Sequence, residues 1–120
     1  MGKKIGIVGS RRRDKHKDYI KVREAFLEIY KKGDSIVSGG CPKGGDRFAE
    51  MIAKDEFIDI HIFKPDWSKG RFAGFTRNTD IARMSDVLIA CVAPDRKGGT
   101  EDTIRKFTKR FHPKGKIILV

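Results

Sequence analysis

The segment Lys-Ile-Gly-Ile-Val-Gly at residues 4–9 is a short, β-rich apolar run that ends in glycine. A run of this length and composition is typical of a buried strand. An arginine-rich loop follows it, and apolar residues then recur at helical spacing between Asp18, which can cap a helix, and Gly33, which suits a helix end. The start of the chain therefore predicts a strand followed by a helix.

The same alternation continues along the rest of the chain. Further strands are expected at residues 35–38, 57–63, 86–92 and 116–120, and further helices from near Asp46, over 76–84, and from a cap at Thr100. Strands that alternate with helices form a parallel sheet covered on both faces. We expect a single α/β domain over residues 1–120, a Rossmann-like doubly wound three-layer fold with a five-stranded parallel sheet in the order 3-2-1-4-5.

The net charge is strongly basic and is concentrated near the two ends. The chain carries 27 Lys and Arg against 16 Asp and Glu, a net charge of +11, and its pI is near 9.9. Residues 1–32 hold 11 basic and 4 acidic side chains, residues 33–95 hold 8 and 10, and residues 96–120 hold 8 and 2. Such charge suggests nucleic acid as a partner, or simply a solvated surface. In the expected topology the cations at 11–13 and 96–97 meet across the sheet and focus a positive field on one anion pocket.

Several classes of protein are disfavoured. The longest apolar run, residues 87–93, is far shorter than the ~20 residues of a membrane span, so no membrane partner is expected. Cys41 and Cys91 lie 50 positions apart without metal-ligand spacing, which predicts neither a disulfide framework nor a metal site. We expect a cytoplasmic protein that requires no cofactor.

Glycine-rich loops follow three of the expected strands. They begin at Gly9, after the first strand, at Gly39, after the second, and at Gly98, after the fourth. In an open α/β sheet, ligands bind at the carboxyl ends of the strands, where the strand order switches direction. Glycine N–H groups and helix amino termini there bind anions. Turn chemistry explains each loop alone, but three at one edge favour a phosphate-bearing ligand.

Two familiar phosphate-binding motifs are absent. The chain has no Gly-x-x-x-x-Gly-Lys-Ser/Thr sequence, which disfavours a P-loop NTPase. Gly6 and Gly9 are not followed by the third glycine of the dinucleotide fingerprint, and the second strand ends in Ser38 instead of an acid. An ordinary NAD dehydrogenase is therefore disfavoured.

Other side chains in these loops suit a nucleotide, although each has a plainer role. Asp46 can accept from ribose hydroxyls or cap a helix, and Trp67 can stack on a base or pack in the core. Arg71 and Arg77 can grip phosphate or remain solvated. Asn78 can contact a base edge or tie the loop together.

Glu101 and Asp102 are the candidate catalytic residues. They open the last helix, where acids complement the helix dipole. In an enzyme, one of them would stabilise an oxocarbenium-like transition state during cleavage of a ribosyl N-glycosidic bond.

Four motifs together resemble those of a known superfamily. They are Ile-Val-Gly-Ser at 7–10, Ser-Gly-Gly-x-x-x-Gly-Gly-Asp-Arg at 38–47, Asp-Trp with Gly-Arg-Phe-Ala-Gly and Arg-Asn over 66–78, and Gly-Gly-Thr at 98–100. The chain resembles the SLOG superfamily, closest to its small YspA-related branch. Members are Rossmann-like domains thought to bind nucleotides or nucleotide-derived ligands, and include lonely-guy phosphoribohydrolases and DprA-type proteins. The lonely-guy enzymes carry Gly-Gly-x-Gly-Thr-x-x-Glu, whereas this chain has Thr103 at the glutamate position.

Three functions are consistent with these observations. The leading hypothesis is a nucleotide-binding protein, the second is a phosphoribohydrolase-like N-glycosidase, and the third is a DprA-like nucleic-acid-binding module. Pairing with a second copy of the chain is left open. The predicted ligand-binding residues are Gly9, Ser10, Arg11, Gly39, Gly40, Gly44, Gly45, Asp46, Asp66, Trp67, Arg71, Arg77, Asn78, Gly98, Gly99 and Thr100.

Overall fold

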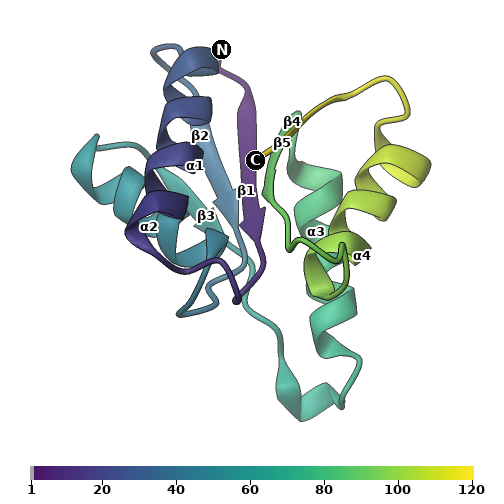
Figure 1. Cartoon of the computed structure of the whole chain (residues 1–120). Helices are drawn as coiled ribbons and strands as arrows, with labels where there is room; N and C mark the ends of the chain where they lie inside the picture. The colour runs from purple at the N-terminus through teal and green to yellow at the C-terminus, as the bar shows by residue number, and fades with distance from the viewer. Residues whose placement is uncertain (1) are drawn as a thin grey trace.

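The computed structural model describes residues 2–120, in which strands and helices alternate (Figure 1). The elements are β1 (Lys4–Gly9), α1 (His16–Ile29), β2 (Ser35–Ser38), α2 (Gly45–Asp55), β3 (Ile60–Ile62), the 3-10 turn η1 (Trp67–Lys69), α3 (Ala73–Met84), β4 (Val87–Cys91), α4 (Gly99–Lys106), a π-helical turn (Phe107–Phe111) and β5 (Lys116–Leu119). Within this range, no helix combines the length and the apolar character that crossing a membrane requires.

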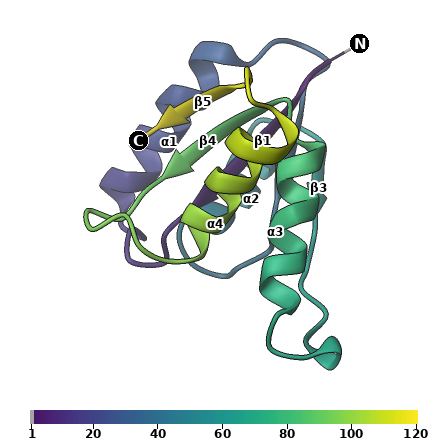
Figure 2. The same ribbon diagram turned by 90° about the vertical axis from the view of Figure 1, so that its right-hand side faces the viewer.

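The five strands form one parallel sheet in the order β3-β2-β1-β4-β5. β1 lies at its centre, where Ile5 pairs with Ile36 of β2 and Ile7 pairs with Ile89 of β4. Helices α1 and α2 cover one face of the sheet, and α3 and α4 cover the other (Figures 1 and 2). The predicted Rossmann-like three-layer fold and its strand order are confirmed, and the strand order switches between β1 and β4.

The sheet separates two apolar cores that fix the position of β1. On the face of α1 and α2, Phe26 and Phe48 are fully buried in one cluster with Ile7. On the opposite face, Val8 belongs to a second cluster with the fully buried Phe107. Burial of a side chain of this size contributes about 1.5–3 kcal/mol. Because successive side chains of β1 are buried on opposite faces, its carboxyl end is held firmly.

The helix ends differ in detail from those predicted. Asp18 does not cap α1; it is the third helical residue, and its carboxylate accepts the N–H of Lys15 at 3.2 Å. Gly33 lies in the turn beyond the helix, at φ +97°. α4 begins at Gly99, one residue before the expected cap Thr100, because Gly98 occupies the cap position at φ +121°. Glycine reaches this backbone region without the strain that a side chain would add.

The connection from α2 to α3 departs furthest from the prediction. β3 covers three residues instead of the seven expected, because Phe57 adopts φ +54° and turns the chain before the strand begins. α3 begins at Ala73, three residues earlier than expected. The segment between β3 and α3 projects from the body of the molecule (the teal segment at the bottom of Figures 1 and 2).

Candidate functional site

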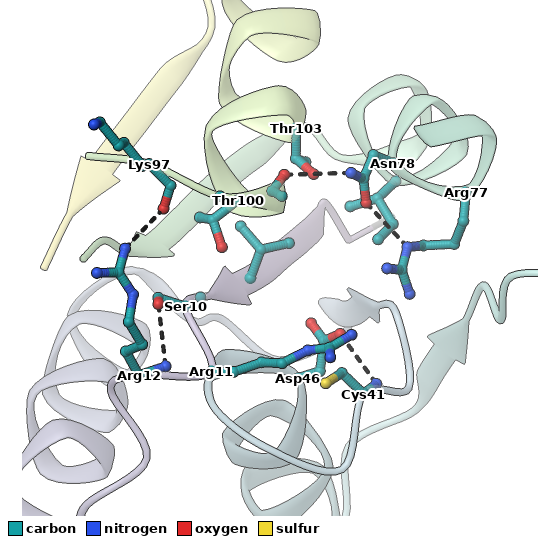
Figure 3. A pocket seen from close by; sticks show the side chains of 15 residues that line it. Ser10, Arg11, Arg12, Cys41, Asp46, Arg77, Asn78, Lys97, Thr100 and Thr103 are labelled. Carbon is teal, nitrogen blue, oxygen red and sulfur yellow. Dashed lines mark hydrogen bonds between the residues drawn. The ribbon is translucent and has the colours of Figure 1, made fainter. Parts of the chain in front are cut away.

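A cavity of about 390 Å³ opens at the carboxyl ends of β1 and β4, where the strand order switches (Figure 3). Ligands bind at this position in open α/β sheets, and the volume is within the range of small-molecule sites. The lining residues are Val8, Gly9, Ser10, Arg11, Arg12, Cys41, Asp46, Arg77, Asn78, Ile81, Lys97, Gly98, Gly99, Thr100 and Thr103.

The start of α4 forms one wall of the cavity, and its backbone is unobstructed. A Cβ added to Gly98 would meet no described atom within 4 Å, and one added to Gly99 would come no closer than 3.9 Å, to Nδ2 of Asn78. The first N–H groups of a helix have no acceptor within the helix. Together with the helix dipole they attract anions, so an anion in the cavity can approach this backbone directly.

The glycines where β1 meets α2 are tightly packed instead. A Cβ on Gly45 would lie 2.3 Å from the carbonyl carbon of Val8 and 2.4 Å from the nitrogen of Gly9. A Cβ on Gly44, at φ +74°, would lie 2.4 Å from the carbonyl oxygen of Ser10. These glycines allow two stretches of backbone to touch. Gly9 still lines the cavity, whereas Gly44 and Gly45, also expected to bind the ligand, do not line it.

Arg77 and Asn78 connect two sides of the cavity through a chain of hydrogen bonds (Figure 3). Arg77 donates from Nη1 to the carbonyl oxygen of Gly39 at 2.6 Å, and from Nε to Oδ1 of Asn78 at 3.0 Å. Asn78 donates from Nδ2 to Oδ2 of Asp102 at 3.2 Å and to the carbonyl oxygen of Gly99 at 3.3 Å. The guanidinium is therefore oriented before any ligand binds, and both predicted residues line the cavity.

Asp46 is the buried carboxylate of the cavity wall, with 7% of its surface exposed. It accepts hydrogen bonds from Oγ of Ser38 at 3.2 Å and from the N–H of Cys41 at 3.1 Å. Asp46 is not the cap of α2, because Gly44 occupies that position. Burial raises the pKa of Asp46, and the N–H of Cys41 and the charge of Arg77 offset this only in part. The carboxyl group can accept from a hydroxyl when ionised and donate to one when protonated.

The positive field at the cavity is smaller than the sequence predicted. Three of the five loop cations are paired with acids: Arg12 with Asp95, Arg13 with Asp18, and Arg96 with Glu101. Arg11 and Lys97 line the cavity, and no carboxylate of residues 2–120 lies within 4 Å of their charged groups. Together with Arg77 they are the cations available to an anion there.

Other predicted ligand residues lie outside the cavity, in the projecting segment. Asp66 accepts from the N–H and the hydroxyl of Ser68. Trp67 is 60% exposed, so it is not part of the core, and it does not line the cavity. The guanidinium of Arg71 lies over the ring of Phe72. The remaining predicted residues that do not line the cavity are Gly39, Gly40, Gly44 and Gly45.

Neither candidate catalytic acid lines the cavity, because both are engaged elsewhere. Both carboxylate oxygens of Glu101 accept from the guanidinium of Arg96, at 2.8 and 2.9 Å. Asp102 is 5% exposed and pairs with Arg105 at 2.5 Å and with Lys106 at 2.9 Å. Asp102 acts on the cavity only through Asn78, as a positioning residue.

The sequence analysis missed several lining residues. Arg12 and Lys97 were expected beside the pocket as part of the two basic loops, but not as ligand-binding residues, and Cys41 lies within the second glycine loop. Thr103 follows Thr100 by three positions, so helical spacing could have identified it. Two apolar residues complete the set: Val8 and Ile81.

The residues that the structure describes contain no cluster of three or more His, Cys, Asp or Glu that could hold a metal ion. Comparison with known proteins found no match to a protein-family model, a curated protein or a solved structure. We therefore infer the function of the protein from the geometry of the cavity.

Proposed function

We propose that this protein binds a nucleotide, or a ligand derived from one, and holds its phosphate in the cavity between β1 and β4. One observation carries the proposal: the unobstructed start of α4 and the oriented guanidinium of Arg77 border the same cavity, and Asn78 connects them. Helix amino termini and arginine side chains are two of the groups that proteins use most to bind phosphate.

Asp46 supports binding of a ribose beside the phosphate. Its oxygens accept hydrogen bonds from the hydroxyl of Ser38 and the N–H groups of Cys41 and Gly39. An ionised carboxylate can accept about four, so it retains capacity for ribose hydroxyls. A carboxylate that can accept from hydroxyl groups, beside cations that bind phosphate, matches the adjacent ribose and phosphate of a nucleotide.

The fold and the position of the cavity support the resemblance to the SLOG superfamily, and we propose that the chain belongs to its YspA-related branch. Each of the four motifs that carry the resemblance contributes residues to the cavity wall, whereas Asp66 and Trp67, at the start of the third motif, lie outside it. The free thiols of Cys41 and Cys91 suit a reducing compartment, in our proposal the cytoplasm.

We propose binding without assigning hydrolysis, because Glu101 and Asp102 are paired with Arg96, Arg105 and Lys106 instead of lining the cavity. A carboxylate that stabilises an oxocarbenium-like transition state must lie beside the scissile bond. The N-glycosidase hypothesis therefore has no observation in its favour at these two residues.

A panel of AMP, ADP-ribose and cyclic nucleotides tests the proposal. We expect at least one of them to raise the melting temperature, and calorimetric titration then gives its dissociation constant. Arg77→Gln should weaken that binding roughly 10- to 150-fold, because a hydrogen bond to a charged group contributes about 1.5–3 kcal/mol.

Arg83→Gln is the matched control, since Arg83 lies on the same helix, is largely exposed and does not line the cavity. It should leave the dissociation constant unchanged. The proposal fails if no nucleotide shifts the melting temperature and none copurifies with the protein, as judged by mass spectrometry. It fails equally if both arginine variants bind like the wild-type protein.

A further inference from the structure

A second hollow, of about 280 Å³, adjoins the phosphate cavity. It lies between α3 and residues 64–69, which run alongside that helix after β3. Thr76, Arg77 and Asp80 of α3 form one side, and Lys64 and Lys69 belong to the other. Arg77 lines both spaces, so the two hollows are neighbours that share one arginine.

The charges along this groove favour an anionic ligand. Lys64 and Lys69 line it, and neither ammonium group lies within 4 Å of a carboxylate in the part of the chain that the structure describes. Its two acids, Asp66 and Asp80, are outnumbered by the two lysines and Arg77, and Asp80 also lies 3.6 Å from Arg83. The uncompensated charge of the groove is therefore positive.

An exposed aromatic ring lines the same groove. Phe72 has 62% of its surface exposed, although Arg71 lies 5.0 Å from the centre of its ring. Trp67, in the projecting segment, and Phe75, in the first turn of α3, are 60% and 48% exposed, but neither lines the groove. Large aromatic side chains left in water beside lysines are the combination with which proteins stack nucleobases along a charged backbone.

We propose that this groove is a second subsite that binds a second nucleoside unit, so that the ligand carries two bases joined through phosphate. This inference rests on the function proposed above. The first nucleotide occupies the cavity, Arg77 contacts the linking phosphate, and the second base stacks on Phe72 while Lys64 and Lys69 neutralise the backbone. A phosphate that links two nucleosides would lie between the two spaces, beside the arginine that lines both of them. Two separate nucleotides would not need a cation that both spaces share.

Calorimetric titration of the whole chain with three probes tests the subsite. The probes are AMP, 5′-phosphorylated ApA and a 5′-phosphorylated oligoadenylate of ten units. We expect phosphorylated ApA to bind roughly 5- to 150-fold more tightly than AMP, the range expected for stacking of one base. Because stacking tolerates any base, adenine is a suitable probe. The ten-unit probe distinguishes two possible ligands that carry linked bases. Tighter binding of this probe than of phosphorylated ApA indicates the end of a nucleic-acid strand, and equal binding indicates a soluble dinucleotide.

Phe72→Ala should remove most of the gain from the second unit and leave the affinity for AMP unchanged. Phe57→Ala is the matched control, since Phe57 is 95% exposed and precedes β3, at the opposite end of that strand from the groove. It should change neither affinity. If phosphorylated ApA binds no more tightly than AMP, or if Phe72→Ala weakens both equally, the second subsite is wrong and the proposed function stands. If none of the three probes binds but another nucleotide of the earlier panel does, the second subsite is wrong and the proposed function stands; if no nucleotide binds and none copurifies, both are wrong.

Discussion

Two glycine-rich corners lie at the same edge of the sheet and use glycine for opposite purposes. At the packed corner, formed by Gly9, Gly44 and Gly45, a side chain would collide with main-chain atoms at 2.3–3.0 Å. At the open corner, formed by Gly98 and Gly99, an added Cβ would have no described neighbour closer than 3.9 Å. Both corners join a strand to a helix start, yet one holds the fold together and the other leaves space beside the cavity.

This difference shows that glycine in a strand-to-helix loop is not by itself a sign of a ligand. What distinguishes the corners is the atom that a side chain would meet. Where a side chain would meet backbone atoms, the glycine contributes to stability. Where a side chain would instead enter the cavity, the glycine keeps the helix start accessible to a ligand. Substitutions at the two corners should therefore affect different properties.

The largest effect is expected at the packed corner. Gly45→Ala places a methyl group 2.3–2.5 Å from three backbone atoms of Val8 and Gly9, which cannot move without disturbing β1. We expect a loss of about 3 kcal/mol or more in the free energy of unfolding, measured by urea denaturation.

Gly99→Ala is the matched control, since it adds the same methyl group in the first turn of the other helix. It should change the free energy of unfolding by no more than about 1 kcal/mol, in the stabilising direction, because alanine favours helix over glycine. Equal losses at Gly45 and Gly99 would mean that the two corners do not differ.

Asp102 supports the open corner through Asn78, which donates hydrogen bonds to Asp102 and to Gly99. Asp102→Ala removes one of the two acceptors of the buried Asn78 amide, leaves it the carbonyl oxygen of Gly99, and releases Arg105 and Lys106. We expect a loss of about 1–3 kcal/mol in the free energy of unfolding. Nucleotide binding should also weaken, because Asn78, which accepts a hydrogen bond from Arg77, is held less firmly. Glu101→Ala, in the same helical turn, breaks only the pair with exposed Arg96 and should cost less than about 1 kcal/mol. Similar losses in the two variants would argue against the role of Asp102.

A smaller effect on binding should appear at Gly99. The methyl group of Gly99→Ala extends the cavity wall toward the phosphate, so we expect affinity to fall by about 1 kcal/mol, roughly fivefold. Calorimetry of the variant with AMP measures it. Unchanged affinity would mean that the phosphate does not approach the start of α4.

The smallest effect is a pH dependence at Asp46. Burial raises the pKa of Asp46, so its folded pKa lies above its unfolded one. Its contribution is then favourable below the unfolded pKa and is lost as the pH rises through the folded pKa. Wild-type protein should lose stability relative to Asp46→Asn as the pH rises from about 4 toward neutrality, in urea titrations at several pH values.

Asp34 supplies a control of opposite sign. Burial opposes ionisation there, but hydrogen bonds from Lys3 and Lys31 outweigh it and lower the pKa of Asp34. Wild-type protein should therefore lose stability relative to Asp34→Asn as the pH falls through the folded pKa of Asp34. The same sign for both variants would contradict the assignment.

The fold could be predicted from the sequence because its signals are local. The runs at 4–9 and 87–93 are too short and apolar to be anything but buried strands between helices, and chain direction and handedness then limit the strand order. The helix starts were harder to predict from the sequence. Asp46 and Thr100 are typical cap residues, but Gly44 and Gly98 occupy the cap positions.

The site was predicted in part, and its errors have a common cause. Arg77 and Asn78 were identified by their side-chain chemistry and line the cavity. Gly45 and Gly99 are indistinguishable in sequence, because the difference lies in which distant backbone approaches them. Trp67 was assigned to ligand or core, and the direction in which residues 64–72 leave the sheet decides its exposure. Contacts between distant segments decided each of these cases.

The most direct test is the amide spectrum of ¹⁵N-labelled protein titrated with AMP. The N–H signals of Gly99 and Thr100, at the open corner, should move progressively with added nucleotide. The signals of Gly44 and Gly45 should move far less. Equal movement at both corners, larger movement at the packed corner, or no movement at saturating AMP would contradict the claim that the open corner is the phosphate site.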